Sequence, residues 1–292
     1  MKVGISIVSF NTKNLLESCL KQLQNQKVRE SEVWVVDNCS EDGSADMVEK
    51  EFKKVNLIRN DQNVGFAKGH NISLKKMSAD LILILNPDTE VPEDSLEKMV
   101  EFMERNPKCG ISSCKIVGFD GTMHSNGGDE PVGLALMSWL FNLEVLGELP
   151  NFHRQEESYY KIAHPVGWVG GTFMMVRSEV FQKIGYLNED YFMYFEDSEF
   201  CYRAKRAGFE VLINPDLTIK HASGASSKDP RLRQWTGEMV GLLKFYKANF
   251  GSFKYWLVKT LVYFSTILRI IAFSILGKKE VAKTYGQVLA AI

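Results

Sequence analysis

The tripeptide Asn86-Pro87-Asp88 comes directly after an unbroken apolar run, Leu81–Leu85. A run of this kind, with polar residues on both sides, is typical of a strand that is buried on both faces of a sheet. Because Pro87 ends strand pairing, we expect the Asp88 carboxylate at the carboxyl edge of the sheet, where open α/β sheets bind their ligands. The same tripeptide is also common in tight turns that have no chemical role.

Other titratable residues occupy comparable positions. Asp37 ends a second apolar run at residues 32–37, His221 follows a late strand, and Glu196 and Asp197 lie at the start of a helical pattern. In the acidic pair, mutual repulsion and partial burial would raise the pKa of one carboxyl toward the range that a general base needs. The alternative is that the two acids only complement the helix dipole and that the histidine is structural.

The elements that must position these residues alternate between strands and helices. β-Favouring runs are followed by loops with capping side chains and then by apolar residues at helical spacing. This alternation predicts right-handed βαβ crossovers and a mostly parallel sheet, which would bring Asp37, Asn63 and Asp88 to one edge. Strands are expected at residues 3–10, 32–37, 55–59, 80–85, 109–117, 172–176 and 209–214, the last with an extension to 221.

Two segments have weaker patterns. Residues 123–164 lack periodicity and are interrupted by glycine and proline, so we expect a long irregular excursion that is mobile or shaped by the substrate. Residues 222–230 are expected to form a flexible loop. We interpret Arg231 and Arg233 as part of the same loop, folding over a diphosphate, although charged loop residues are often only solvated.

The composition is that of an ordinary soluble protein. The chain has 292 residues, 45% hydrophobic and 24% charged, enough for one large domain or two smaller ones. A formal net charge of -1 disfavours nucleic acid as a partner. The five cysteines are odd in number and form no CxxC pair, which disfavours a disulfide framework or zinc site and favours the reducing cytosol. The first apolar run is too short for a signal peptide and is expected to be a core strand.

The C-terminal segment at residues 253–276 is apolar and aromatic, but Lys254, Lys259 and Arg269 interrupt it. A membrane span needs about 20 uncharged residues, and no window here offers them. The pattern favours a helix that lies in the membrane interface with its basic residues toward the lipid headgroups. The alternative is a helical hairpin packed on the protein's own core or on a dimer partner.

A series of short motifs resembles the family 2 glycosyltransferases, and most of all their rhamnosyltransferase-type branch. The resemblance covers about residues 3–227 and is specific because every motif occurs in the family's order and approximate spacing. The motifs are Val8-Ser9-Phe10-Asn11, Val36-Asp37-Asn38-Cys39-Ser40-Glu41-Asp42-Gly43-Ser44, Asn63-Val64-Gly65-Phe66-Ala67, Asn86-Pro87-Asp88, Gly170-Gly171-Thr172-Phe173, Tyr194-Phe195-Glu196-Asp197, Arg203 and His221.

The resemblance implies a GT-A fold, an inverting sugar transfer from a nucleotide-sugar donor, and a divalent metal, Mg²⁺ or Mn²⁺. We interpret Asp197 as the catalytic base and, by the resemblance, Asp88 and His221 as metal ligands. Asn86 replaces the first acid of the family's Asp-X-Asp motif, which lowers the negative charge of the metal site. The other expected site residues bind the nucleotide (Ser9, Asn11, Asp37, Asn63, Gly65 and Asn86) or the acceptor (Trp168, Gly171 and Glu196).

These features predict a glycosyltransferase that acts on a lipid-linked or polysaccharide acceptor at the cytoplasmic face of the membrane, with dTDP-rhamnose as the candidate donor. The expected catalytic domain is residues 1–235, with a nucleotide-sugar half at about 1–120 and an acceptor half at about 121–235. Residues 236–292 are expected to form a C-terminal helical region that contacts the membrane or a second subunit of a homodimer.

Two other functions remain open at this point. A nucleotidyltransferase also uses a sheet edge, carboxylates and Mg²⁺, but it usually has a loop rich in glycine and lysine after its first strand, and residues 9–13 contain no glycine. The second alternative is not an enzyme but a non-catalytic protein that binds nucleotide sugars or acts as a membrane scaffold.

Overall fold

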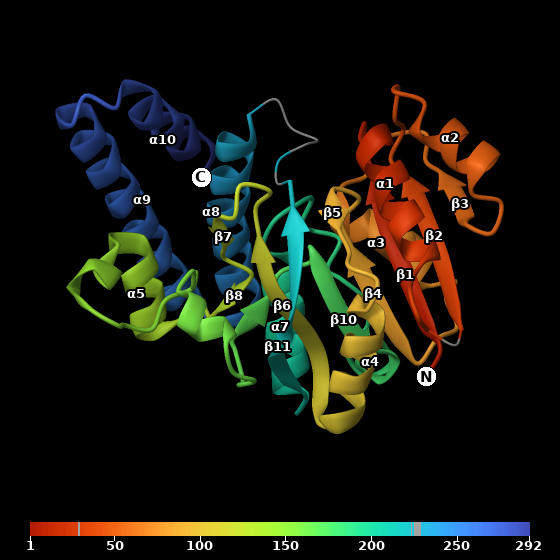
Figure 1. The fold of residues 1–292 in the computed structure, drawn as a ribbon. Coiled ribbons are helices and arrows are strands. Elements are labelled where there is room, and N and C mark those ends of the chain that lie inside the picture. The colour runs from red at the N-terminus through yellow and green to blue at the C-terminus, as the bar shows by residue number, and fades with distance from the viewer. Residues whose placement is uncertain (29, 223, 225–228) are drawn as a thin grey trace.

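The computed structural model describes residues 1–28, 30–222, 224 and 229–292. Its centre is one sheet with the strand order β3-β2-β1-β4-β10-β6-β11-β5, in which β7 also pairs with β6 (Figure 1). The strands are β1 (Val3–Ser9), β2 (Ser31–Asp37), β3 (Asn56–Arg59), β4 (Leu81–Leu85), β5 (Thr89–Glu90), β6 (Cys109–Val117), β7 (Met123–His124), β10 (Phe173–Arg177) and β11 (Glu210–His221).

The N-terminal strands are parallel, as their alternation with helices predicts. In β1, Ser9 is paired with Asp37 of β2, and Ile7 is paired with Leu85 of β4, so these strands end at the same edge. β10 is antiparallel to both β4 and β6, which makes the sheet mixed rather than mostly parallel. The sequence does not reveal this difference because a strand buried on both faces has the same apolar pattern in either direction.

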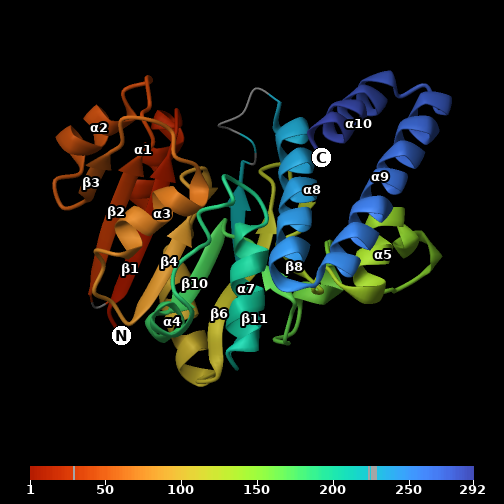
Figure 2. The ribbon, with the colours of Figure 1, turned by 180° about the vertical axis from the view of Figure 1, so that it is seen from behind.

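Helices cover both faces of the sheet, so that β4 is buried on both sides as expected. Leu83 packs in the core cluster that includes helices α1, α2 and α4, and Ile84 packs in the cluster that includes α3, α6 and α7. Figure 1 shows α1 and α4 in front of the sheet, and Figure 2, which views the molecule from behind, shows α3 and α7 on the opposite face. The helices are α1 (Lys13–Gln24), α2 (Ser44–Glu51), α3 (Phe66–Leu74), α4 (Ser95–Arg105), α6 (Ser178–Ile184) and α7 (Glu196–Arg206).

The expectation of an irregular segment at residues 123–164 is wrong, whereas its mobility or shaping by the substrate stays a prediction. The segment contains α5 (Gly133–Phe141), the short 3₁₀ helices η1 (Leu143–Leu146) and η2 (Glu157–Tyr160), and β8 (Gly127–Gly128), which pairs with β9 (Trp168–Val169). Phe152 and Tyr160 are almost fully buried in the core. Helix α5 is apolar nearly all round and the rest of the segment is held by single aromatic anchors, so the sequence shows no periodic alternation of apolar and polar residues.

The C-terminal region consists of α8 (Pro230–Asn249), α9 (Ser252–Ile275) and α10 (Lys279–Ala291). Pro230 occupies the first turn of α8, and the Asp229 side chain caps it by accepting a hydrogen bond from the Leu232 N–H. Arg231 and Arg233 therefore lie on a helix, and their interpretation as loop residues is wrong. Most of the expected flexible loop at residues 222–230 lies outside the described residues.

Helix α9 has one face toward the protein and one toward solvent. Val258 and Val262 are buried, and α9 packs beside α5 and α10, as both views show (Figures 1 and 2). By length and composition, α9 is the one helix in the described part of the chain that could cross a membrane, although the sequence analysis found no such window. Its exposed face consists of Phe253, Trp256, Leu257, Phe264, Ile267, Leu268, Ile271 and Ile275.

Candidate active site

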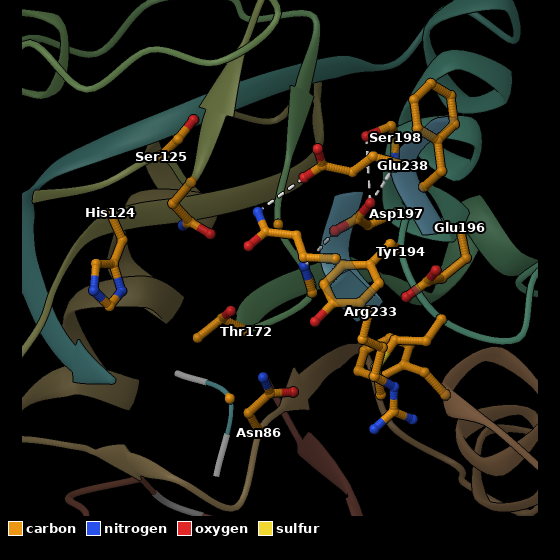
Figure 3. A pocket seen from close by; sticks show the side chains of 18 of the residues that line it. Asn86, His124, Ser125, Thr172, Tyr194, Glu196, Asp197, Ser198, Arg233 and Glu238 are labelled. Carbon is orange, nitrogen blue, oxygen red and sulfur yellow. Dashed lines mark hydrogen bonds between the residues drawn. The ribbon is translucent and has the colours of Figure 1, made fainter. Parts of the chain in front are cut away.

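A cavity of about 560 Å³ opens where β1, β2 and β4 end. The parallel register of these strands brings the residues that follow them to one edge, which is the position expected for a ligand site in an open α/β sheet. Most of the site residues expected from the sequence line this cavity. They are Asn63, Gly65, Asn86, Asp88, Trp168, Gly171, Glu196, Asp197 and His221. Figure 3 shows Asn86, Glu196 and Asp197 around the cavity.

Ser9, Asn11 and Asp37 lie at the same sheet edge but do not line the cavity. The Ser9 hydroxyl lies 3.0 Å from that of Thr12, and the Asn11 Oδ1 accepts a hydrogen bond from the Glu41 N–H. Asp37 is buried, and its Oδ2 accepts a hydrogen bond from the Ser40 N–H. Its other oxygen, Oδ1, has no hydrogen-bond partner among the described residues.

An amide network beside Asp37 was not anticipated from the sequence. Asn38 lines the cavity, and its Nδ2 donates to the Gly65 carbonyl at 3.1 Å, while its Oδ1 accepts from Asn60. Asn63 Oδ1 accepts from the Gly65 N–H at 3.0 Å. The network fixes the residues that precede α3. One of them, Gly65, has a left-handed φ of 85°, and an added Cβ there would lie 2.4 Å from the Phe192 carbonyl oxygen.

Asp88 and His221 meet although they are far apart in the sequence. β11 is paired with β5 through His221 and Thr89, and this pairing brings the His221 Nε2 to 3.0 Å from the Asp88 Oδ1. The Asn86 Nδ2 lies 3.3 Å from the same ring nitrogen. One carboxylate and one imidazole form a donor set that suits a divalent cation when substrate phosphates supply further oxygens.

His124 is a neighbour of this pair that the sequence analysis did not identify. The pairing of β7 with β6 places its ring 5.9 Å from that of His221, in the lining of the cavity. Burial, together with the nearby His221, lowers the pKa of His124, so its imidazole is neutral near pH 7. Within the described residues, no group of three or more His, Cys, Asp and Glu side chains is arranged to hold a metal by itself.

A strained turn holds the acidic pair at the start of α7. Tyr194 and Phe195 both have left-handed φ values, 69° and 77°, which cost about 1–3 kcal/mol each for residues other than glycine. The packing of Phe195 against the rings of Phe152 and Phe245 stabilises the turn. Strained backbone of this kind is concentrated at functional sites, and here it determines the direction of the Asp197 side chain.

Backbone N–H groups hold the Asp197 carboxylate. Its Oδ2 accepts from the Gly171 N–H at 3.0 Å, and its Oδ1 accepts from the Ser198 N–H at 2.7 Å. An added Cβ at Gly171 would lie 2.7 Å from the Phe66 ring, so only glycine fits at this position. Burial raises the pKa of Asp197 above its usual range, although these hydrogen bonds oppose the shift. A carboxylate with a raised pKa is suited to accept a proton from a substrate.

The pKa of the neighbouring carboxyl, Glu196, is raised further than that of Asp197. Its side chain is 3% exposed, and its Oε2 has no hydrogen-bond partner among the residues that the structure describes. Burial raises its pKa well above the usual range, and the nearby Asp197 adds to the shift. Glu196 is therefore the member of the pair that favours the protonated form.

A second wall of the cavity comes from residues 133–168 and from α8, α9 and α10. Trp168, expected to bind the acceptor, is buried, stacks on Phe152 and donates its indole N–H to the Phe152 carbonyl. Arg233 lines the cavity from the first turn of α8. Sequence patterns did not identify the other residues of this wall, because each lies alone in an unremarkable local context. They include Trp139, His153, Trp235, Glu238, Arg269 and Tyr285.

Comparison with a family model gives a match to "Glycosyl transferase family 2" over residues 5–185. Two similar proteins are the low-salt glycan biosynthesis hexosyltransferase Agl10 of Haloferax volcanii, 29% identical over 211 residues, and the N-acetylglucosaminyl-diphospho-decaprenol L-rhamnosyltransferase of Mycobacterium tuberculosis, 24% identical over 237 residues. The first alignment covers 71% of this chain and 63% of the relative, and the second covers 76% and 77%.

The fold is similar to that of the mannosyltransferase PcManGT from Pyrobaculum calidifontis, whose structure contains GDP-Man and Mn²⁺. The TM-score is 0.58 at 18% identity, and the match covers 99% of this chain and 74% of that one. At this identity the similarity concerns the fold alone, and it confirms the GT-A fold expected from the sequence.

Replacing Glu196 with glutamine is expected to change how stability depends on pH. Because the folded-state pKa of Glu196 is raised, the unfolded chain binds fewer protons above its own pKa, and the free energy of unfolding falls as pH rises. The Glu196→Gln variant should therefore be more stable than the parent at about pH 8, with a smaller difference at about pH 5. Urea denaturation at both pH values measures this, with Glu97→Gln on the exposed face of α4 as control. Parallel pH dependence in the parent and the Glu196 variant would contradict the assignment.

Proposed function

Because the chain belongs to glycosyl transferase family 2, we propose that it transfers a sugar from a nucleotide-sugar donor to a hydroxyl group of an acceptor, with inversion at the anomeric carbon. One observation supports this proposal most directly. The Asp197 carboxylate, with its raised pKa, lines the same cavity as Asn86, Asp88 and His221. A proton acceptor thus shares a cavity with groups suited to a cation and a diphosphate.

In the proposed reaction, Asp197 accepts the proton of the acceptor hydroxyl as that oxygen bonds to the anomeric carbon. The bond between the anomeric carbon and the diphosphate oxygen breaks, and its electron pair leaves with the nucleoside diphosphate. Because there is one displacement, the configuration is inverted. The Gly171 and Ser198 N–H groups hold the carboxylate in position before the acceptor arrives, which reduces the cost of orienting it during the reaction.

We assign the donor to the sheet edge. Asp37 is buried behind the cavity lining, and its Oδ1 has no hydrogen-bond partner among the described residues, so we assign it to the nucleobase or ribose on condition that donor binding uncovers it. Asn63, Gly65 and Asn86 line the cavity together with Asp88. Ser9 and Asn11 do not line the cavity, and we assign them to hold the loops at this edge through their contacts with Thr12 and Glu41. The name of the mycobacterial relative, an L-rhamnosyltransferase, supports rhamnose as the transferred sugar, and dTDP-rhamnose, which the sequence motifs suggest, is the donor to test first. The donor half would comprise about residues 1–120, and the acceptor half about residues 121–235.

Asp88 and His221 are the proposed ligands of a divalent cation, Mg²⁺ or Mn²⁺. Mg²⁺ commonly binds one or two carboxylates and completes its coordination with substrate phosphates and water, which fits a site with few protein ligands. When bound, the cation would neutralise the negative charge that develops on the leaving diphosphate.

For the acceptor we propose a lipid-linked glycan at the cytoplasmic face of the membrane. The name of the mycobacterial relative specifies a lipid-linked acceptor. The exposed apolar face of α9, next to Lys254 and Lys259, suits insertion into the headgroup region of an anionic bilayer. Arg269 ties the same helix to the protein, because its Nη2 donates to the Trp139 carbonyl and to Asn142.

Substitution of the proposed base tests the reaction. Asp197→Asn has nearly the same shape, but its amide cannot take up the proton. Its one oxygen can accept from only one of the Gly171 and Ser198 N–H groups, so the transfer rate should fall by about a hundredfold or more. The assay measures release of dTDP from dTDP-rhamnose in the presence of an N-acetylglucosaminyl diphosphate lipid. Asp190→Asn, an exposed acid in the same segment, is the matched control. Full transfer by the folded Asp197 variant would refute the base assignment, and binding of nucleotide without transfer by the parent would indicate a non-catalytic protein.

The cation proposal predicts that Mn²⁺ increases the stabilisation of the protein by dTDP in a thermal-shift experiment, because a ligand that binds only the native state raises the melting temperature. Asp88→Asn and His221→Ala should remove the metal-dependent part of the shift and leave a smaller shift by dTDP alone. Asp216→Asn, an exposed acid on β11, should behave as the parent does. An unchanged metal effect in both site variants would place the cation elsewhere.

The membrane proposal predicts that the protein sediments with vesicles that contain phosphatidylglycerol. Trp256 is 60% exposed, and Trp256→Ser should weaken vesicle binding by about tenfold, which is the loss expected from one buried aromatic side chain. Phe119→Ser, which changes an exposed aromatic residue outside α9, is the control. If the parent protein does not sediment with vesicles and elutes as a dimer in size-exclusion chromatography, α9 contacts a second subunit instead.

A further inference from the structure

Glu238 on α8 is a buried carboxylate with an unused oxygen. The residue is 8% exposed and lines the cavity, and Figure 3 shows its side chain among those that point into it. Its Oε1 accepts a hydrogen bond from the Gln234 Nε2 at 2.9 Å and lies 3.5 Å from the His153 Nε2. Its Oε2 has no hydrogen bond to any residue that the structure describes.

The surroundings of Glu238 do not explain why a carboxylate is buried there. Arg269, a cation on this wall, directs its Nη2 hydrogen bonds to Trp139 and Asn142 and not to Glu238. His153 packs with its ring edge against Trp139, so the imidazole is held and not free to turn. The free oxygen of Glu238 is thus left open to the cavity, where it can accept hydrogen bonds from a ligand.

We infer that Glu238 binds the sugar of the acceptor by accepting hydrogen bonds from its hydroxyl groups. This inference rests on the proposed glycosyl transfer and deepens it. A carboxylate attracts hydroxyl donors and repels phosphate, so the phosphate groups of a lipid-linked acceptor cannot occupy this end of the cavity. The acceptor sugar is therefore held between Glu238 and Asp197, on the wall away from Asp88 and His221.

The same inference gives the C-terminal helices a direct part in substrate recognition. Glu238 comes from α8, and Tyr285 of α10 stacks on Trp235 of α8 with ring centroids 4.4 Å apart. The Arg269 guanidinium of α9 lies over the Tyr285 ring, 5.6 Å from its centroid. This column of rings and cations fixes the helix that carries Glu238, so the region that we propose to contact the membrane also builds the acceptor subsite.

The test is a binding measurement and does not require turnover. A water-soluble N-acetylglucosaminyl diphosphate with a short alkyl chain is titrated onto the full chain and followed by ligand-observed NMR. Glu238→Gln keeps the volume and removes the charge, and it should weaken binding of this probe by about tenfold or more, since hydrogen bonds to charged groups are strong. Gln234→Ala, which removes only the residue that orients the Glu238 carboxylate, should have a smaller effect of the same sign.

Glu97→Gln on α4 is the matched control and should bind the probe as the parent does. The stabilisation by dTDP in the thermal-shift experiment should be unchanged in Glu238→Gln, which separates loss of the acceptor subsite from loss of the fold or of donor binding. Equal probe affinity in the parent and in Glu238→Gln, or no binding of the probe to the parent, would overturn the inference. A parent that binds the probe through Glu238 but transfers no sugar would instead refute the proposed function alone.

Discussion

The half-buried carboxylate of Asp197 is the constraint on which the candidate site depends. A charge in the interior is stable only where hydrogen bonds replace its water, and the Gly171 and Ser198 N–H groups meet this need. The N–H groups can reach the carboxylate because Gly171 has no side chain to meet the Phe66 ring. Two successive residues with left-handed φ, Tyr194 and Phe195, also precede α7. Much of the aromatic packing around Phe195 can be understood as the stabilisation that offsets this strained turn.

The cavity joins two walls of different origin. One wall is the carboxyl edge of the sheet, where the parallel register of β1 with β2 and β4 sets the positions of Asn38 and Asn86. The other wall consists of residues 133–168 and α8 to α10, which reach the site through isolated side chains such as His153 and Glu238.

Helix α9 links this second wall to the exterior. Its inner face carries Arg269 into the cavity lining, and its outer face carries an exposed row of apolar side chains that includes Trp256 and Ile271. The two roles are compatible because they use opposite sides of one helix. If the outer face lies in a bilayer, the cavity is held near the membrane surface, at the depth where the sugar of a lipid-linked acceptor is found.

The local sequence determined the strands of the sheet and the wall of the cavity at the sheet edge. The apolar run of β4, ended by Pro87, carries its own signal for a buried strand, and Asp88 was therefore located correctly at the sheet edge. Tertiary structure alone decided that β10 is antiparallel, that residues 123–164 form ordered elements, and that Arg233 and Glu238 line the cavity. Periodicity reports which face of an element is buried, but it carries no record of contacts between segments that are a hundred residues apart. The second wall is built from such contacts, and only the folded chain reveals it.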